Sequence, residues 1–218
     1  MLIDTHKAIS KAIIKSQHCQ RNWDLTKEIP EEDMRLIELA ATQCPSKQNI
    51  AHYNVHFITN REIIEKLHSE TDGFTYKYQP KMTTTNTQVL ANLVIAFESL
   101  PVEEKLGDKY RNDQTYELNQ DKNVIENKSI LERDLNMAIG IAAGYVNLVA
   151  TLLGYSTGCC ACFSTANINQ ILNTKNNVSL LMGVGFGDPT LNRRVHHLDH
   201  SFIFNTLKKQ PIKVNYYK

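Results

Sequence analysis

The sequence predicts an α+β fold in one domain, with helices packed around a central sheet. Short β-rich runs bounded by polar residues are typical of strands. Three such runs occur, at 53–59, 93–97 and 178–184. A longer stretch from about 132 to 153, rich in small and apolar residues, predicts a buried helix. The length of 218 residues suits one sizeable core better than two small ones.

The composition is that of an ordinary globular protein. Hydrophobic residues make up 42% and charged residues 22% of the chain. Lys and Arg together number 24 against 23 Asp and Glu, so no bulk charge indicates nucleic acid or an anionic membrane as a partner. Any anion site must therefore be local.

The sequence also suggests the compartment. The first ten residues carry Asp4 and lack an apolar core, so they do not resemble a secretory signal. The apolar stretch 137–153 is interrupted by Asn147 and two glycines, and we expect a buried helix there, not a membrane span. Five cysteines, three of them within 159–162, do not form the pattern of a secreted disulfide framework. Reduced thiols in a cytoplasm are the simplest account.

Capping and proline signals place the other helices. Asp4 and Thr5 suit the cap of a first helix, and Pro30 suits the start of a second. Pro45 forces Cys44 out of helical geometry and so ends the second helix. We expect further short helices at 61–69 and 165–172, and only weak helix in the polar region 101–133.

Three segments far apart in the sequence carry residues suited to chemistry: 17–24 (QHCQRNWD), 44–49 (CPSKQN) and 183–194 (GVGFGDPTLNRR). Each has a plain structural explanation when taken alone. His18 and Arg21 suit a solvated loop, and 46–49 suits an ordinary turn at a helix end. The glycine run is only loosely similar to a nucleotide loop, because no glycine-rich helix start follows it.

Their joint order resembles the FMN-dependent nitroreductase family over roughly residues 8–197. In order, the matching features are the HCQRNWD loop, the IPEED helix start, the P-S-x-x-N turn, the N-x-Q-V-L-A segment with LVIAF, the small-residue helix, Leu-Gly-Tyr at 153–155, and the G-x-G-F strand end with its arginines. The resemblance implies a mixed central sheet surrounded by helices. It also implies an intertwined homodimer with two FMN sites at the interface. Residues 1–218 would form one FMN-binding domain, whose tail 201–218 wraps the partner.

The resemblance implies the following cofactor contacts. The first loop and the late arginines would hold the FMN phosphate and ribityl chain, because a phosphate favours forked, permanently charged donors. Two side chains would face the pyrimidine edge of the ring, backbone amides the reactive edge, and the serine turn would lie beside the flavin. The first loop and the late arginines supply Gln17, His18, Cys19, Arg21, Arg193 and Arg194, and the pyrimidine-edge side chains are Asn86 and Gln88. The reactive-edge amides are those of Cys160, Ala161 and Cys162, and the serine turn supplies Pro45, Ser46, Lys47 and Asn49.

Some positions depart from the family pattern. Ala161 stands where relatives often carry an acidic residue, and Gln17 stands where they usually carry Arg. Cys19 replaces a usual Ser or Thr, and a thiol is a weaker hydrogen-bond donor than a hydroxyl. These changes affect the expected substrate more than the expected cofactor.

The implied activity is a ping-pong transfer of hydride from NAD(P)H through FMN to a small acceptor such as a nitroaromatic, a quinone or a flavin. No side chain need act as a nucleophile, so we assign no catalytic residue and no metal. A specialised family chemistry, which dehydrogenates or fragments a substrate or the flavin itself, is one variant of this activity. Two alternatives to it stay open. One is a flavin-binding or storage protein without turnover. The other is a zinc or redox-dithiol site built from Cys159, Cys162 and the histidines 196, 197 and 200.

Overall fold

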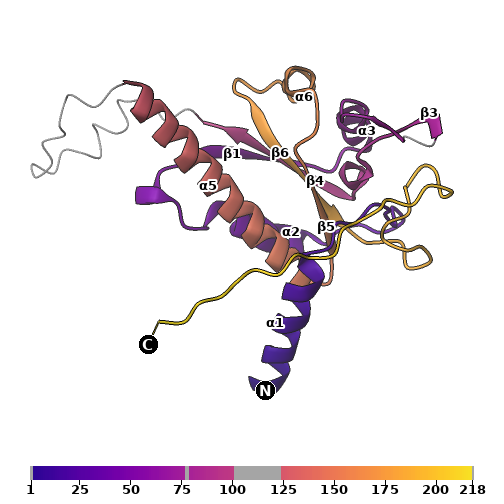
Figure 1. Ribbon diagram of the computed structural model, residues 1–218, viewed down its shortest axis with the longest axis horizontal. Helices are drawn as coiled ribbons and strands as arrows, with labels where there is room; N and C mark the ends of the chain where they lie inside the picture. Colours follow the sequence, from indigo (N-terminus) through magenta and orange to yellow (C-terminus); the bar gives the residue numbers. More distant parts are fainter. Residues whose placement is uncertain (1, 77–78, 101–123, 218) are drawn as a thin grey trace, which may run out of the picture.

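The computed structural model describes residues 2–76, 79–100 and 124–217, and its centre is a four-stranded sheet in the order β1-β4-β6-β5 (Figure 1). The strands are β1 Tyr53–Ile58, β4 Leu93–Ser99, β5 Ser156–Cys160 and β6 Val178–Gly185. All three pairings between these strands are antiparallel. A parallel bridge joins Cys19 to Thr157 beside β5. The α+β fold predicted from the sequence is confirmed.

β4 forms the middle of the core because both of its faces are covered. All seven of its residues are buried, and successive side chains of a strand point to opposite faces. Leu93, Ile95 and Phe97 join one hydrophobic cluster, whereas Val94 and Ala96 join the other. The sheet therefore lies between two layers of helices.

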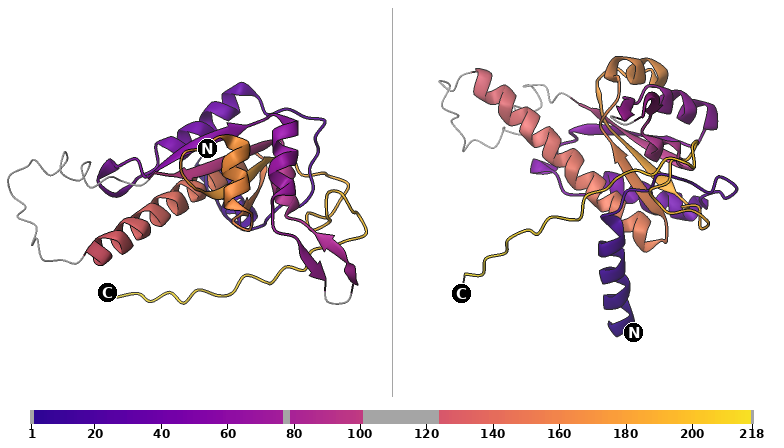
Figure 2. Two further views of the ribbon diagram at one scale, coloured as in Figure 1. Left: turned by 90° about the horizontal axis from the view of Figure 1, so that it is seen from above. Right: turned by 45° about the vertical axis from the view of Figure 1, so that its right-hand side comes forward.

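The two layers contain different helices (Figure 2). One cluster contains residues of α2 and α5, and the other contains residues of α3, α6 and the 3-10 turn η2. The helices are α1 Leu2–Ser16, α2 Glu31–Thr42, α3 Arg61–Ser69, α5 Val124–Leu152 and α6 Thr165–Leu172, with the turns η1 Lys47–Asn49 and η2 Thr87–Leu90. A separate hairpin joins β2 Phe74–Tyr76 to β3 Gln79–Thr84.

Helix α5 crosses the sheet and presents a second apolar face outward. Within the described residues, its segment Glu132–Leu152 is long and apolar enough to cross a membrane, but 39% of the tested window is buried in the fold. The core helix of a soluble protein passes the same test. Met137, Ile141 and Tyr145 remain exposed on α5. Among the described residues, this apolar face remains exposed.

Both ends of the chain extend away from the sheet (Figure 1). The C-terminal end of α1 contacts α5, where the Asn147 side-chain amide donates to the Ser16 carbonyl at 2.9 Å. The tail after Phe204 is extended and carries exposed apolar side chains, including Leu207, Ile212 and Tyr216.

Several element boundaries differ from the sequence expectations. Asp4 and Thr5 lie inside α1, not at its cap, because the helix begins at Leu2. Strand β5 was not expected, since its sequence STGCC lacks the usual β-branched run and depends on pairing with β6. Helix α5 extends N-terminally to Val124, into the region where we expected weak helix. The remainder of that region, 101–123, lies outside the described residues.

Candidate functional site

The segment between α1 and residue 24 lies along the outer edge of β5. The Gln20 amide donates to the Thr157 carbonyl at 2.8 Å, and the Arg21 amide donates to the Arg193 carbonyl at 2.9 Å. The Asp24 amide donates to Phe186 beyond β6, also at 2.8 Å. The sheet therefore fixes a segment that the sequence alone showed only as a polar loop.

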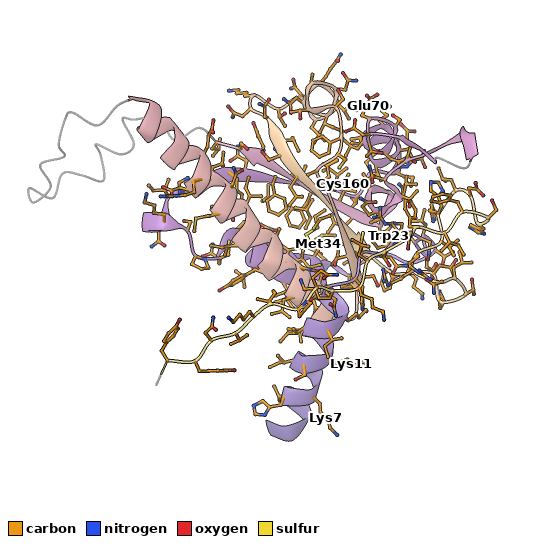
Figure 3. All side chains as sticks on the ribbon, viewed as in Figure 1. Lys7, Lys11, Trp23, Met34, Glu70 and Cys160 are labelled. Carbon is orange, nitrogen blue, oxygen red and sulfur yellow. The ribbon has the colours of Figure 1, made fainter. Side chains whose placement is uncertain are left out.

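Two buried side chains anchor this segment. Trp23 donates from its indole nitrogen to the Thr87 carbonyl at 2.9 Å, and its ring belongs to the hydrophobic cluster that also contains Cys160 (Figure 3). Asn22 is fully buried, and its amide donates to the carbonyls of Asn192 and Val195. Buried polar groups are seldom left without partners, so these bonds rigidify the site.

A polar network connects the first loop to the segment 86–88. The Arg21 guanidinium donates through Nη1 to the Gln88 side-chain oxygen, and Gln88 donates to Asn86 Oδ1 at 3.3 Å. Gln88 also donates to the Cys159 carbonyl at 3.2 Å, and Asn86 donates to the Cys162 carbonyl at 3.5 Å. The structure thereby joins three segments that the sequence analysis assigned to one site.

Arg193 completes this cluster, whereas Arg194 points elsewhere. The Arg193 guanidinium donates to the Cys19 carbonyl at 3.1 Å. Partial burial of His18, followed by the charge of Arg193, lowers the pKa of His18. Arg194 instead bonds its own neighbour, Asn192. Gln17 donates to the Ile14 carbonyl at the end of α1. Arg193 therefore lies beside the first loop, whereas the side chains of Gln17 and Arg194 form hydrogen bonds with residues outside the network.

The segment 45–49, which includes η1, lies away from this network and contacts α5 through Lys47. Ser46 donates to the Ile50 carbonyl at 2.9 Å, and Lys47 forms an ion pair with the buried carboxylate of Asp134 on α5. Pro45, Ser46 and Asn49 line a cleft of about 1060 Å³. Within the single chain, the serine turn and the arginine network lie at two separate places.

Three of the thiols in this region have raised pKa values. Burial raises the pKa of Cys19, and burial likewise raises the pKa of Cys159 and of Cys160 to about 11. Protonated thiols are poor nucleophiles and poor metal ligands. Among the described residues, no three His, Cys, Asp or Glu side chains are grouped so as to hold a metal ion. The arrangement gives no support to the zinc or dithiol alternative.

The glycines of β5 and β6 allow η2 and the first loop to approach the sheet. A Cβ on Gly158 would lie 2.6 Å from the Gln88 Cβ and 3.0 Å from the Cys19 sulfur. A Cβ on Gly183 would overlap the Gln88 carbonyl oxygen. Gly158 and Gly183 thus serve close packing around Gln88, whereas an added Cβ on Gly185 or Gly187 would meet Asn92 or Gln20.

We expect Gly183→Ala to displace η2 and to lower the free energy of unfolding by about 1–3 kcal/mol, since backbone atoms cannot yield as side chains do. Urea unfolding measures this loss. Gly140→Ala on α5 is the matched control, because its added methyl meets nothing within 4 Å. Equal effects of the two substitutions would contradict the packing role of Gly183.

Comparison with known proteins identifies the family. Residues 14–187 match the nitroreductase family, so the chain belongs to it and the resemblance seen in the sequence is confirmed. No curated protein matches the sequence.

Solved structures share the fold at low sequence identity. The Bacillus subtilis protein ydfN, named as a nitroreductase, superposes with a TM-score of 0.65 at 14% identity over 96% of both chains. A protein of Staphylococcus epidermidis named as an NAD(P)H:FMN oxidoreductase gives 0.58 at 16% identity, covering 82% of this chain and 86% of its own. A nitroreductase of Exiguobacterium sibiricum, solved with FMN, gives 0.57 at 18%, covering 91% and 92%. At these identities the similarity establishes the fold.

Sequence reasoning missed the residues that support the site. Asn22, Trp23 and Gly183 act through buried contacts with segments distant in sequence. Phe204 was missed as well, because it lies in the tail 201–218, which we considered only as an extension, whereas His196 entered only as part of the zinc or dithiol alternative. The one signal for Trp23 was its place in the first-loop motif.

Proposed function

We propose that the protein is an FMN-dependent oxidoreductase that passes hydride from NAD(P)H to a small acceptor, such as a nitroaromatic, a quinone or a flavin, by a ping-pong cycle. The observation that carries this proposal is the joining of Arg21, Gln88, Asn86 and Arg193 around the 159–162 segment. The bound FMN would supply the hydride chemistry, and the protein would supply position and charge.

The donors present fit this cofactor. Arg21 Nε is buried and has no hydrogen-bond partner among the described residues, and such an orphaned donor calls for an acceptor. FMN offers both a phosphate and a polar ring edge, which suit guanidinium and amide donors respectively. Two arginines from separate segments match the charged part of that requirement, and the side chains of Gln88 and Asn86 lie in the same network.

The contacts suggest how the roles divide. We propose that His18, Cys19 and Arg193 hold the phosphate and ribityl chain, with Gln17 and Arg194 at its rim. Because Arg21 bonds Gln88, we propose that its guanidinium lies at the pyrimidine edge beside Gln88 and Asn86, whereas the family resemblance implied a contact with the phosphate. A positive charge there favours the reduced, anionic ring. The backbone of Cys160, Ala161 and Cys162 would face the reactive edge.

We further propose that the site is completed by a second copy of the chain. Pro45, Ser46, Lys47 and Asn49 lie apart from the arginine network, so they would contact the cofactor of the partner subunit. The exposed apolar faces of α1 and α5, including Ile9, Ile13, Met137 and Ile141, are suited to a homodimer interface. All five cysteines are free thiols, which supports a reducing cytoplasm as the compartment.

Deleting residues 206–218 is expected to raise the dimer dissociation constant more than about 100-fold, since burial of each large apolar side chain stabilises an interface by about 1.5–3 kcal/mol. The tail exposes Leu207, Ile212, Val214 and Tyr216 in the single subunit. Sedimentation velocity across a dilution series measures the change. Lys208→Gln with Lys209→Gln is the control within the same tail, and a truncated chain that stays as dimeric as this control would contradict the proposal.

Titration of dialysed protein with FMN tests the cofactor directly. We expect quenching of the FMN fluorescence, with one FMN bound per chain. Protein that leaves FMN fluorescence unchanged at micromolar concentrations would refute the proposed function.

A further inference from the structure

Arg21 makes a contact that the cofactor assignment does not use. Its guanidinium carbon lies 4.3 Å from the centre of the Phe204 ring, within the range of a cation–π interaction. Phe204 is 95% buried, which strengthens such an attraction by excluding water. The face of the guanidinium is thereby occupied, while its edge still donates to Gln88 and carries the unpartnered Nε.

A compact hairpin at residues 194–204 fixes the Phe204 ring. Val195 and Ile203 form an antiparallel bridge, and the Phe204 amide donates to the Arg194 carbonyl at 2.8 Å. The Phe202 ring packs edge-on against Phe204, with ring centres 5.1 Å apart. His196 lies nearly parallel to Phe204, at 5.7 Å and 17°.

His196 is itself held in one state. Its Nδ1 accepts hydrogen bonds from the amides of Leu198 and Asp199, at 3.2 and 3.0 Å. An accepting Nδ1 leaves the ring proton of the neutral form on Nε2. The ring beside Phe204 is therefore neutral and adds no charge that would repel Arg21.

We propose that Phe204 is a positioning residue, which holds the Arg21 guanidinium at the edge of the flavin site with its donors aimed at the cofactor. This inference rests on the proposed function, because it assumes that Arg21 contacts FMN. The hairpin thereby belongs to the cofactor site, although none of its side chains beyond Arg194 was assigned to it.

The chemistry separates this role from simple packing. Leu at position 204 retains an apolar side chain but lacks the negative ring face that attracts a cation, whereas Tyr retains that face. If Phe204 serves only to fill space, the FMN affinity of each variant should follow how well Leu or Tyr packs in place of Phe. A positioning role predicts that the Leu variant loses cofactor affinity and that the Tyr variant recovers it.

The test measures FMN dissociation constants and the flavin midpoint potential for the wild type, Phe204→Leu and Phe204→Tyr, with thermal unfolding recorded for each. We expect Phe204→Leu to weaken oxidised FMN binding about tenfold. We expect reduced FMN to be weakened about tenfold more, which for a two-electron couple lowers the midpoint potential by about 30 mV. Phe204→Tyr should stay within about twofold of the wild type.

A double-mutant cycle keeps the test decisive if either variant loses stability. In an Arg21→Gln background, Phe204→Leu should change the FMN dissociation constant less than about twofold, because the group that it positions is gone. The same tenfold loss in both backgrounds would overturn the positioning role and leave the proposed function standing. A wild-type chain that fails to bind FMN would instead overturn the function itself.

Discussion

Replacing Arg193 with Ala is expected to weaken FMN binding about 100-fold, because charge-assisted hydrogen bonds to a phosphate contribute roughly 1.5–3 kcal/mol each. The guanidinium lies on the first loop through its bond to the Cys19 carbonyl. Its loss would remove a fixed positive charge and also loosen that loop. The backbone bond from the Arg21 amide to the Arg193 carbonyl survives the substitution, so the fold should persist.

Arg194→Ala provides the matched control for this result. Arg194 is the adjacent arginine, but its side chain bonds Asn192 and not the first loop. We expect its replacement to weaken FMN binding less than about fivefold, as for a charge at the rim of a site. Fluorescence titration with FMN at fixed ionic strength measures both variants. Equal losses would show that the phosphate does not lie at Arg193.

The second large effect is a loss of stability in mild acid through His68. This histidine is buried, and its Nε2 lies 2.7 Å from the Thr85 hydroxyl. Burial, followed by the proximity of His196, Arg61 and His197, lowers its pKa from 6.5 to about 4. Between these pH values the unfolded chain binds the proton and the folded chain does not. The free energy of unfolding therefore falls as the pH drops from about 6.5 to about 4, by about 3 kcal/mol.

Urea unfolding between pH 4 and pH 7 measures this dependence. His68→Gln should make the curve less steep over that range, because an amide can still bond Thr85 but does not titrate. His200→Gln is the control, since His200 is an exposed histidine of the adjoining hairpin. A His68→Gln protein that loses as much stability in acid as the control would contradict this origin of the pH dependence.

The sequence predicted most of the framework because its strongest patterns are local. The compact apolar run 93–97 predicts a buried strand, and the small-residue stretch that ends at Gly154 predicts a helix, and both are present. Strand β5 was missed because STGCC has no local β pattern and exists through its pairing with β6. Long-range pairing of this kind leaves no mark in a short window of sequence.

The candidate site was likewise predicted only in part from the sequence. The motif order was enough to single out His18, Arg21, Gln88 and Arg193. It was not enough to show that Arg21 bonds Gln88, or that Arg193 and Arg194 differ in their contacts. Those distinctions depend on the hairpin 194–204 folding back onto the first loop, and neither segment has a sequence pattern that reports its partner.

The visible absorption spectrum of the freshly purified protein, recorded before and after anaerobic addition of NADPH and then NADH, tests the central claim most directly. The account predicts flavin absorption that bleaches with one or both donors and returns when a quinone or a nitroaromatic is added. Flavin that stays oxidised with both donors would indicate a storage protein, and a colourless protein that stays so with added FMN would contradict the cofactor assignment.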